Sequence, residues 1–284
     1  TVTNTATISI AAGNDLVFSG GSDSFANSQL GHGGLFADGN HSGSITISTA
    51  RDLRFSGGSG LLAYSQLGHG GYRTNGNHSG GITIMTANDL NFSSGVGSNA
   101  YSQLGHGGDD ADGNHNGDIT IVTVRDLNFS AGDDLGAYSQ LGHGGRSADG
   151  NYGGGITIIT ANDLSFDAGG GITAYSQLGH GGDFADGNHS GDITISTARD
   201  LHFCAGDGFQ AYSQLGHGSA DFGNGSQIIG TCQGAISVTA SGEISLIDGT
   251  NPATNFNYGW LGHGNRATAA GAYSNADVTV RATA

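Results

Sequence analysis

Residues 117–153 read GDITIVTVRDLNFSAGDDLGAYSQLGHGGRSADGNYG, and close copies of this segment lie on both sides of it. The histidine of the LGHG motif recurs at a constant spacing of 37 residues, and a last copy follows after 46. The members of this row are His32, His69, His106, His143, His180, His217 and His263. A fixed spacing of this length is the signature of a solenoid or a similar repeat architecture. The sequence therefore predicts one continuous array of repeats.

Three short segments of the repeat alternate apolar and polar side chains. They are residues 119–122, 126–130 and 137–143, and Gly and Asp residues separate them. Alternation with period two indicates a strand with one buried face, and no helical period is present. In the third segment we expect Leu141 to point inward and Tyr138 to point outward.

Three strands per repeat predict an all-β fold, a parallel β-helix or β-solenoid with one 37-residue repeat per coil. Each strand then pairs with its own copy one coil above and below, so that identical inward side chains stack. The Phe row is Phe18, Phe55, Phe92, Phe129, Phe166 and Phe203, and the Leu row is Leu16, Leu53, Leu90, Leu127, Leu164 and Leu201. An alternative with two coils of 18 or 19 residues per repeat would stack AYSQ on ITI and mix unlike side chains.

The first strand sets the expected number of coils. Its members are Ile8, Ile45, Ile82, Ile119, Ile156, Ile193, Ile236 and Val278. These eight rungs correspond to about seven coils. We expect a regular solenoid over residues 1–217 and degenerate coils, with insertions, over residues 218–284.

Composition narrows the classes of partner. The 284 residues include 55 Gly, and 24 acidic residues against 8 basic ones give a net charge of −16. Nucleic-acid binding needs a basic footprint, so we expect no nucleic-acid partner. No apolar run of about 20 residues is present, so we expect no membrane-spanning helix. For Cys204 and Cys232, a disulfide and two unpaired thiols both stay open.

The Asp that opens the second strand forms a row of like charges on neighbouring coils, which is unfavourable by itself. The row consists of Asp15, Asp52, Asp89, Asp126, Asp163 and Asp200. The residue before it alternates between Asn and Arg, as in Asn88, Arg125 and Asn162. We expect each Arg to bridge the Asp of its own and adjacent coils, as structural charge compensation rather than as a binding site.

The turn before the first strand, DGNHSG or a close variant, predicts an asparagine ladder whose amides hydrogen-bond along the stack. Its members are Asn40, Asn77, Asn114, Asn151 and Asn188. Calcium is the alternative, because Asp110, Asp112, Asn114 and Asp118 crowd oxygen ligands into one coil. Neither an EF-hand loop nor a GGxGxD nonapeptide is present. We therefore expect no cofactor, with calcium at this turn as the open alternative.

Histidines form a second row at the same turn, which consists of His41, His78, His115 and His189 and is interrupted by Tyr152. Stacked imidazoles could bind zinc or copper. A metal site needs convergent ligands, however, and identical coils about 4.8 Å apart do not supply them automatically. We expect neutral, hydrogen-bonded imidazoles in both rows, and a loss of stability when acid protonates them below about pH 6.

The third strand carries a Tyr row and a Gln row that we expect to face outward. The rows are Tyr64, Tyr101, Tyr138, Tyr175, Tyr212, Gln66, Gln103, Gln140, Gln177 and Gln214. Such a stripe is typical of a docking surface for carbohydrate or protein, or of a contact between rods. The alternative is a packing seam under the adjoining loops.

Taken together, GDITI, ARDL, AYSQLGHGG and DGNHSGD resemble the repeat regions of filamentous-haemagglutinin-like proteins, the large two-partner-secreted exoproteins of Gram-negative bacteria. The resemblance covers most of residues 4–217, with degenerate copies to residue 284. It implies a right-handed β-helix, an extracellular or cell-surface location, and a structural or adhesive role in a surface fibre. No family active site is available to carry over.

Both ends of the chain read as a first strand without a polar cap, so we expect like subunits stacked end to end or neighbouring rods as partners, besides surface carbohydrate or protein. A carbohydrate-binding or polysaccharide-cleaving β-helix protein is the alternative. We expect no enzymatic activity, because catalysis needs a singular constellation and nearly every polar candidate here recurs. Ice binding is disfavoured because Met85, Val122 and Ile159 interrupt the row beside the regular outward Thr row.

Overall fold

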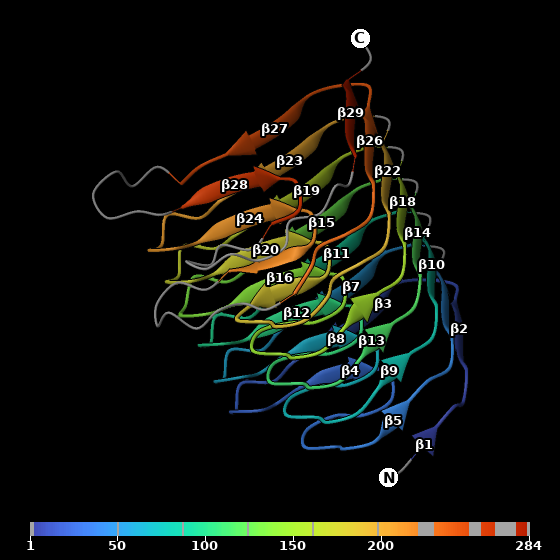
Figure 1. Ribbon diagram of the computed structural model, residues 1–284. Coiled ribbons are helices and arrows are strands. Elements are labelled where there is room, and N and C mark those ends of the chain that lie inside the picture. The colour runs from blue at the N-terminus through green and yellow to red at the C-terminus, as the bar shows by residue number, and fades with distance from the viewer. Residues whose placement is uncertain are drawn as a thin grey trace.

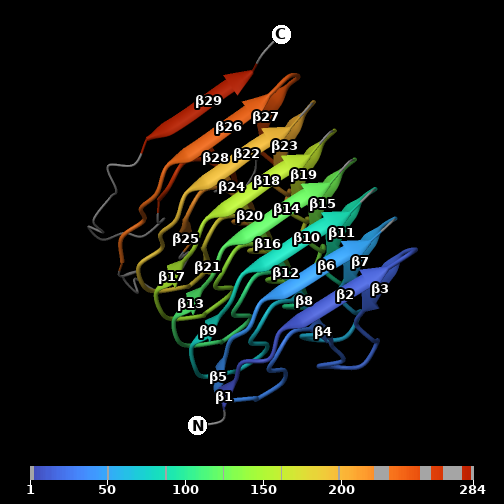
Figure 2. The ribbon, with the colours of Figure 1, turned by 90° about the vertical axis from the view of Figure 1, so that its right-hand side faces the viewer.

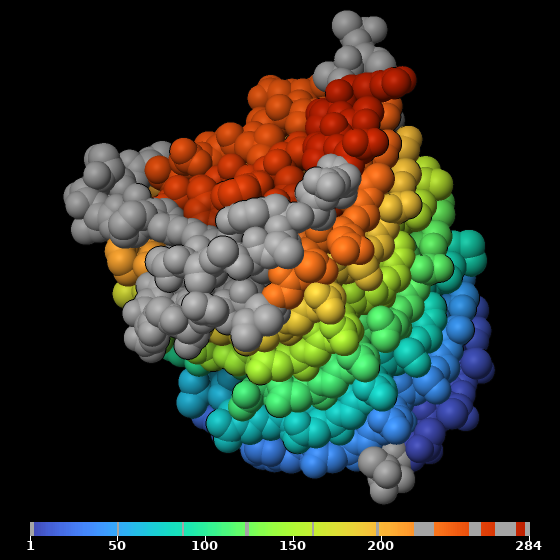
Figure 3. Space-filling model, viewed as in Figure 1, coloured from blue at the N-terminus to red at the C-terminus, as the bar shows by residue number. Residues whose placement is uncertain are grey.

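The computed structural model is a stack of parallel β-coils, as the repeat predicts (Figure 1). It describes residues 3–49, 51–86, 88–123, 125–160, 162–197, 199–220, 230–249, 257–264 and 277–282. The strand residues of the regular coils pair with their copies 37 positions away, as Ile82 does with Ile119. In the space-filling view the coils follow one another as bands from blue to red (Figure 3). The alternative with two small coils per repeat is therefore wrong.

Two of the sheets form walls of the stack. Sheet B faces the viewer in Figure 2, and sheet C lies behind it. Sheet B contains β2 (Ile8–Ala12), β6 (Ile45–Thr49), β10 (Ile82–Thr86), β14 (Ile119–Thr123), β18 (Ile156–Thr160), β22 (Ile193–Thr197), β26 (Ile236–Ala240) and β29 (Val278–Ala282). Sheet C contains β3 (Leu16–Ser19), β7 (Leu53–Ser56), β11 (Leu90–Ser93), β15 (Leu127–Ser130), β19 (Leu164–Asp167), β23 (Leu201–Cys204) and β27 (Ile244–Ile247).

Three further sheets complete the coils. Sheet D contains β4 (Ser28–Leu30), β8 (Ser65–Leu67), β12 (Tyr101–Leu104), β16 (Tyr138–Leu141), β20 (Tyr175–Leu178), β24 (Tyr212–Leu215) and β28 (Tyr258–Leu261). Sheet A contains β1 (Thr3–Asn4), β5 (Asn40–His41), β9 (His78–Ser79), β13 (His115–Asn116) and β17 (Tyr152–Gly153). The short sheet E contains β21 (Gly181–Asp183) and β25 (Gly218–Ala220).

The three predicted strands correspond to sheets B, C and D, but the coil has a fourth strand. Sheet A lies at the turn before the first strand, where only an asparagine ladder was expected. Its strands are two residues long, because each glycine that flanks them breaks the extended pairing. A two-residue strand offers too few positions for alternation to be visible in a sequence.

The later coils accommodate the insertions in loops while keeping the strands in register. Ile193 pairs with Ile236 and Tyr212 pairs with Tyr258, so the extra residues lie between strands. The described strands after residue 230 extend sheets B, C and D. Within the described residues, no helix is long and apolar enough to cross a membrane.

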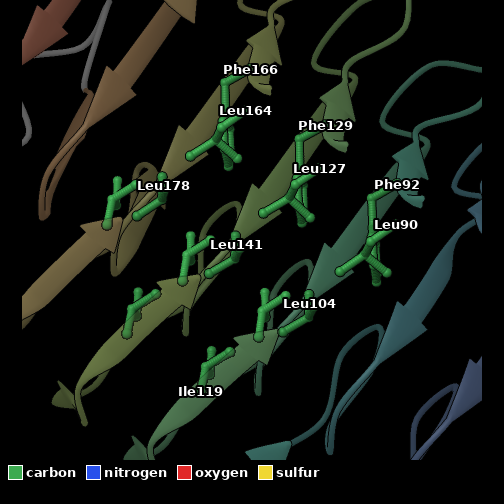
Figure 4. Close-up of a cluster of buried hydrophobic side chains, with 14 of the residues drawn as sticks. Leu90, Phe92, Leu104, Ile119, Leu127, Phe129, Leu141, Leu164, Phe166 and Leu178 are labelled. Atoms are coloured by element: carbon green, nitrogen blue, oxygen red, sulfur yellow. The ribbon is translucent and has the colours of Figure 1, made fainter. Parts of the chain in front are cut away.

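The main hydrophobic core runs along the axis between sheets B, C and D. Leu and Phe of sheet C face Leu of sheet D in Figure 4, and Ile residues of sheet B close the core. The Phe129 ring stacks on Phe92 at 4.9 Å and on Phe166 at 4.8 Å. Burying each such side chain contributes about 1.5–3 kcal/mol, so the repeated rows stabilise the whole length of the stack.

A second buried compartment lies on the opposite face of sheet D. Tyr138 and Gln140, with their copies in the other coils, belong to it: Tyr64, Tyr101, Tyr175 and Tyr212 are 0% exposed, and Gln66, Gln103, Gln177 and Gln214 are also buried. The prediction that these two rows face outward is therefore wrong. Alternation shows that a strand has two faces, but it does not show that the loops following Leu141 fold back over the second face.

The glycines of LGHGG are required by the close approach of neighbouring coils. At Gly142 the backbone has φ +147°, and a Cβ there would lie 2.0 Å from the carbonyl oxygen of Gly179. At Gly145, with φ +134°, a Cβ would lie 2.2 Å from the Gly108 carbonyl oxygen and 3.0 Å from the Tyr138 hydroxyl. Every LGHG motif keeps the first of these glycines because no side chain fits there between the coils, whereas Ser219 stands at the position of Gly145 in a later coil.

Replacing Gly142 by Ala should therefore lower the free energy of unfolding by about 1–3 kcal/mol, since the new Cβ overlaps a backbone oxygen. Gly155→Ala is the matched control, because its Cβ would meet nothing closer than 3.7 Å. Urea unfolding of both variants measures the difference. Equal stability of the two variants would contradict the coil spacing described here.

Candidate functional site

The LGHG histidines are held by the same two hydrogen bonds in successive coils. The backbone N–H of His106 donates to Nδ1 of His143 at 2.9 Å, and Nε2 of His143 donates to the Gly117 carbonyl at 2.8 Å. This pair of partners fixes the neutral tautomer with the proton on Nε2. Rings one coil apart stack at 4.8 Å. Neither ring nitrogen is available to bind zinc or copper.

Burial in this row disfavours the charged imidazolium. Desolvation lowers the pKa of His69 and of His180 to about 4. The pKa values of His106, His143 and His217 lie well below the usual value, again chiefly because of burial and then because of neighbouring histidines. We therefore expect these histidines to remain neutral at physiological pH.

The turn histidines form a second buried row inside sheet A. Nε2 of His115 donates to the Ala111 carbonyl at 3.0 Å, and its Nδ1 lies 3.2 Å from Nδ1 of His78. Tyr152, which replaces a histidine, donates its hydroxyl to the Ala148 carbonyl. Burial lowers the pKa of His115 to about 4 and that of His189 to about 3. Among the described residues, no group of three or more His, Cys, Asp or Glu is placed to hold a metal ion.

These shifts predict that acid destabilises the protein. An unfolded histidine binds a proton as the pH falls through about 6.5, whereas a buried one does not, so unfolding takes up protons. The free energy of unfolding should be highest above pH 7 and should fall below about pH 6.5, by up to about 1.4 kcal/mol per pH unit for each buried histidine. Asp109 acts in the opposite sense, because burial raises its pKa to about 7.

Urea unfolding at pH 8, 7, 6 and 5 measures this dependence. His143→Gln should be less stable than the parent chain but should show a shallower decline, because one proton fewer is taken up. A free energy of unfolding that stays constant from pH 8 to pH 5 would refute the buried neutral rows.

The Asp row is neutralised partly as predicted. Arg125 lies 3.4 Å from Asp89, and the corresponding pairs in other coils are Arg51 with Asp15 at 3.5 Å and Arg199 with Asp163. Each Arg thus contacts the Asp of the preceding coil. The carboxylates also accept the backbone N–H of the next Asp, as Asp126 does from Asp163 at 3.3 Å. These contacts hold coils together, with weak individual ion pairs because the Arg side chains are exposed.

The side chains of the asparagine row bond mainly to the backbone of the next coil. Oδ1 of Asn114 accepts the backbone N–H of Asn151 at 3.1 Å, and Asn40, Asn77 and Asn151 bond to the next coil in the same way. A bond between two side-chain amides occurs between Asn188 and Asn151. The predicted bonds between side-chain amides are therefore largely replaced by bonds from side chain to backbone, because the backbone N–H groups of the turn need acceptors.

The candidate calcium ligands do not converge on one point. Asp112 and Asp118 accept the backbone N–H of Asp149 and Gly155, and Asn114 accepts that of Asn151. Asp110 instead pairs with Arg73 at 2.7 Å. The four oxygen donors are thus engaged separately.

The buried Gln row also joins adjacent coils. Nε2 of Gln140 donates to the carbonyls of Gly179 and Gly181, at 3.3 and 2.9 Å. Tyr138 stacks between Tyr101 and Tyr175, at 4.8 Å from each ring. These side chains are inaccessible to a ligand. They form a packing seam under the adjoining loops.

A polar hollow of about 270 Å³ occurs where two loop rows meet over the Tyr row. Its lining includes Tyr72, Arg73, Asn99, Asp109, Asp110 and Arg146. Tyr72, Asp109 and Arg146 occupy equivalent positions 37 residues apart, yet they differ in chemistry. The chemistry at this position therefore varies along the stack, unlike that of the recurring His, Asn, Asp and Gln rows.

The hollow contains buried polar atoms that form no hydrogen bond within the protein. The Asp109 side chain is 3% exposed, and its Oδ2 has no hydrogen-bond partner; neither does Oδ1 of Asn99 or Nε of Arg146. The Arg146 guanidinium lies between two carboxylates, 3.7 Å from Asp109 and 3.9 Å from Asp183. Sequence reasoning missed this site because it searched for recurring rows. The available signal was the change from Tyr to Asp to Arg at one position of the repeat.

The two cysteines lie in different parts of the coil and do not form a disulfide. Cys204 ends β23, whereas Cys232 is buried beside His189, with Sγ 3.8 Å from Nδ1. Burial raises the pKa of the Cys232 thiol to about 12, so it is not a reactive nucleophile at neutral pH.

No protein-family model, curated protein or solved structure matches this chain.

Proposed function

We propose that this chain is a structural and adhesive segment of a secreted or cell-surface bacterial fibre or large adhesin. The proposal draws on the resemblance of its repeats to filamentous-haemagglutinin-like exoproteins. Its partners would be neighbouring rods or like subunits, together with carbohydrate or protein on the surface that the fibre contacts.

The observation that carries the proposal is a difference between positions of the repeat: recurring polar residues bond to adjacent coils, and a row of variable residues is exposed. The recurring His, Asn, Asp and Gln rows are bonded to adjacent coils. One row of side chains that vary lies at loop tips, where Leu135 is 49% exposed and Ile172 is 51% exposed. Leu61 and Phe209 occupy the same loop position, and Ser98 occupies it in another coil. Exposed apolar side chains in one row favour a contact surface held by a rigid support.

A catalytic role has less support. A polysaccharide-cleaving enzyme needs an acid, a base or a nucleophile with accessible polar atoms in a cleft. The recurring carboxylates instead accept backbone hydrogen bonds, and the recurring imidazoles are buried. We therefore propose a non-enzymatic role.

Adhesion of microspheres that carry the chain tests this function. Beads with the parent chain should adhere to epithelial or bacterial cells several-fold more than beads with the Leu61→Ser, Leu135→Ser, Ile172→Ser, Phe209→Ser variant. The expected loss follows from removal of exposed apolar area, and Ser98 indicates that the loop accepts serine.

Met85→Ser is the matched control, because Met85 is also exposed but lies on sheet B, where Ser48 stands one coil earlier. It should leave adhesion unchanged. Equal adhesion of all three chains, or release of new reducing ends from pectin and other polysaccharides, would contradict an adhesive, non-enzymatic role.

A further inference from the structure

The polar hollow lies between two loop rows that have the same backbone geometry in every regular coil. Asn99 precedes β12 and Asp110 follows the LGHG turn, and both have positive φ, 53° and 60°. Because the repeat fixes these backbones, the chemistry of the hollow depends on the side chains alone. Leu35 and Tyr72 precede Asp109 at the equivalent positions, so the repeat accepts apolar and polar residues there.

Gly136 leaves space beside two residues that line the hollow, Asn99 and Arg146. Its equivalents are Leu62, Asn99 and Thr173, each of which has a side chain. A Cβ on Gly136 would lie 2.2 Å from Asn99 Oδ1 and 3.6 Å from Arg146 Nε. The glycine therefore leaves room next to two of the unpartnered polar atoms.

The unpartnered atoms specify what an occupant must offer. Asp109 Oδ2 and Asn99 Oδ1 need hydrogen-bond donors, and Arg146 Nε needs an acceptor. Leaving such atoms buried and unsatisfied costs free energy, so a ligand that supplies the missing bonds gains affinity. Hydroxyl groups meet both needs, because each one donates and accepts.

The balance of charge favours a neutral occupant. Arg73 pairs directly with Asp110, and the Arg146 guanidinium lies between Asp109 and Asp183. Burial raises the pKa of Asp109 to about 7, so this carboxyl is partly neutral at pH 7 and little net charge remains. An anion would meet Asp109, and a cation would meet Arg146. Tyr72 adds an aromatic ring, over which the Arg73 guanidinium lies at 5.2 Å.

We propose that this hollow binds one ring of a neutral sugar, with Asp109 and Asn99 accepting hydrogen bonds from its hydroxyls and Arg146 donating one. The volume of about 270 Å³ suits a small ligand of this class. The proposal deepens the proposed adhesive function and rests on it, because it names the surface chemistry that one part of the fibre recognises. The sugar is either free or the terminal unit of a glycan.

Saturation-transfer NMR with the full chain at pH 7 tests the proposal. The probes are the methyl glycosides of glucose, galactose, mannose and N-acetylglucosamine, and for each a trisaccharide that ends in the same unit. We expect binding of at least one glycoside. Equal affinity for the matching trisaccharide would indicate a free sugar, and tighter binding of the trisaccharide would indicate a glycan.

Two variants locate the site. Asp109→Leu removes the buried acceptor and reproduces the residue at Leu35, and Gly136→Asn places the side chain that stands at Asn99 against Asn99 Oδ1 and Arg146 Nε. Each should weaken sugar binding tenfold or more at an unchanged melting temperature. Met85→Ser, on sheet B and outside both the loop row and the hollow, should bind as the parent chain does. Should one variant fail to fold, the other still decides the result.

Absence of binding to every sugar, or binding that both variants leave unchanged, would overturn the proposal, because the hollow would then hold solvent only. The outcome is separable from the bead experiment. Adhesion without sugar binding would remove this inference and leave the proposed function. Sugar binding without adhesion would remove the adhesive function and leave the site.

Discussion

The stacking of each residue on its own copy one coil away is the constraint on which the rest of the structure depends. Parallel pairing in register places identical side chains about 4.8 Å apart along the whole stack. Apolar and aromatic residues benefit from this arrangement, because like rings stack and like aliphatic chains fill the same volume. Charged and polar residues face a harder requirement, because identical groups repel one another or compete for the same partner.

The chain meets that requirement by bonding recurring polar side chains to the backbone of the neighbouring coil. An Asp carboxylate, an Asn carbonyl and a His ring nitrogen each accept a backbone N–H of an adjacent coil. Such a bond can repeat in successive coils without conflict, because the donor is a backbone N–H and the acceptor is a side-chain atom. Recurrence of a polar residue thus indicates structure in this protein, and the departures from recurrence at Asp109 and Arg146 indicate where a ligand could be recognised.

Periodicity was enough to predict the architecture, the coil length, the inward Leu and Phe rows and the compensation of Asp by Arg. Those features depend on spacing and on alternation within single strands. The burial of Tyr138 and Gln140 could not be predicted in the same way, because it depends on loops that fold back over sheet D. The hollow depends on loops from three successive coils, and its key residues, among them Asn99, Asp109 and Arg146, are distant in sequence. Only their placement in space brings the unpartnered atoms together.

The claim that recurring polar residues are committed to the stack is tested most directly by the state of the LGHG histidines. Nitrogen-15 NMR of the histidine-labelled chain reports which ring nitrogen carries the proton. The hydrogen bonds of His143 predict a neutral ring protonated on Nε2, unchanged from pH 8 down to about pH 5 while the chain is folded. A mixture of tautomers that titrates near pH 6.5, as free imidazole does, would contradict the account.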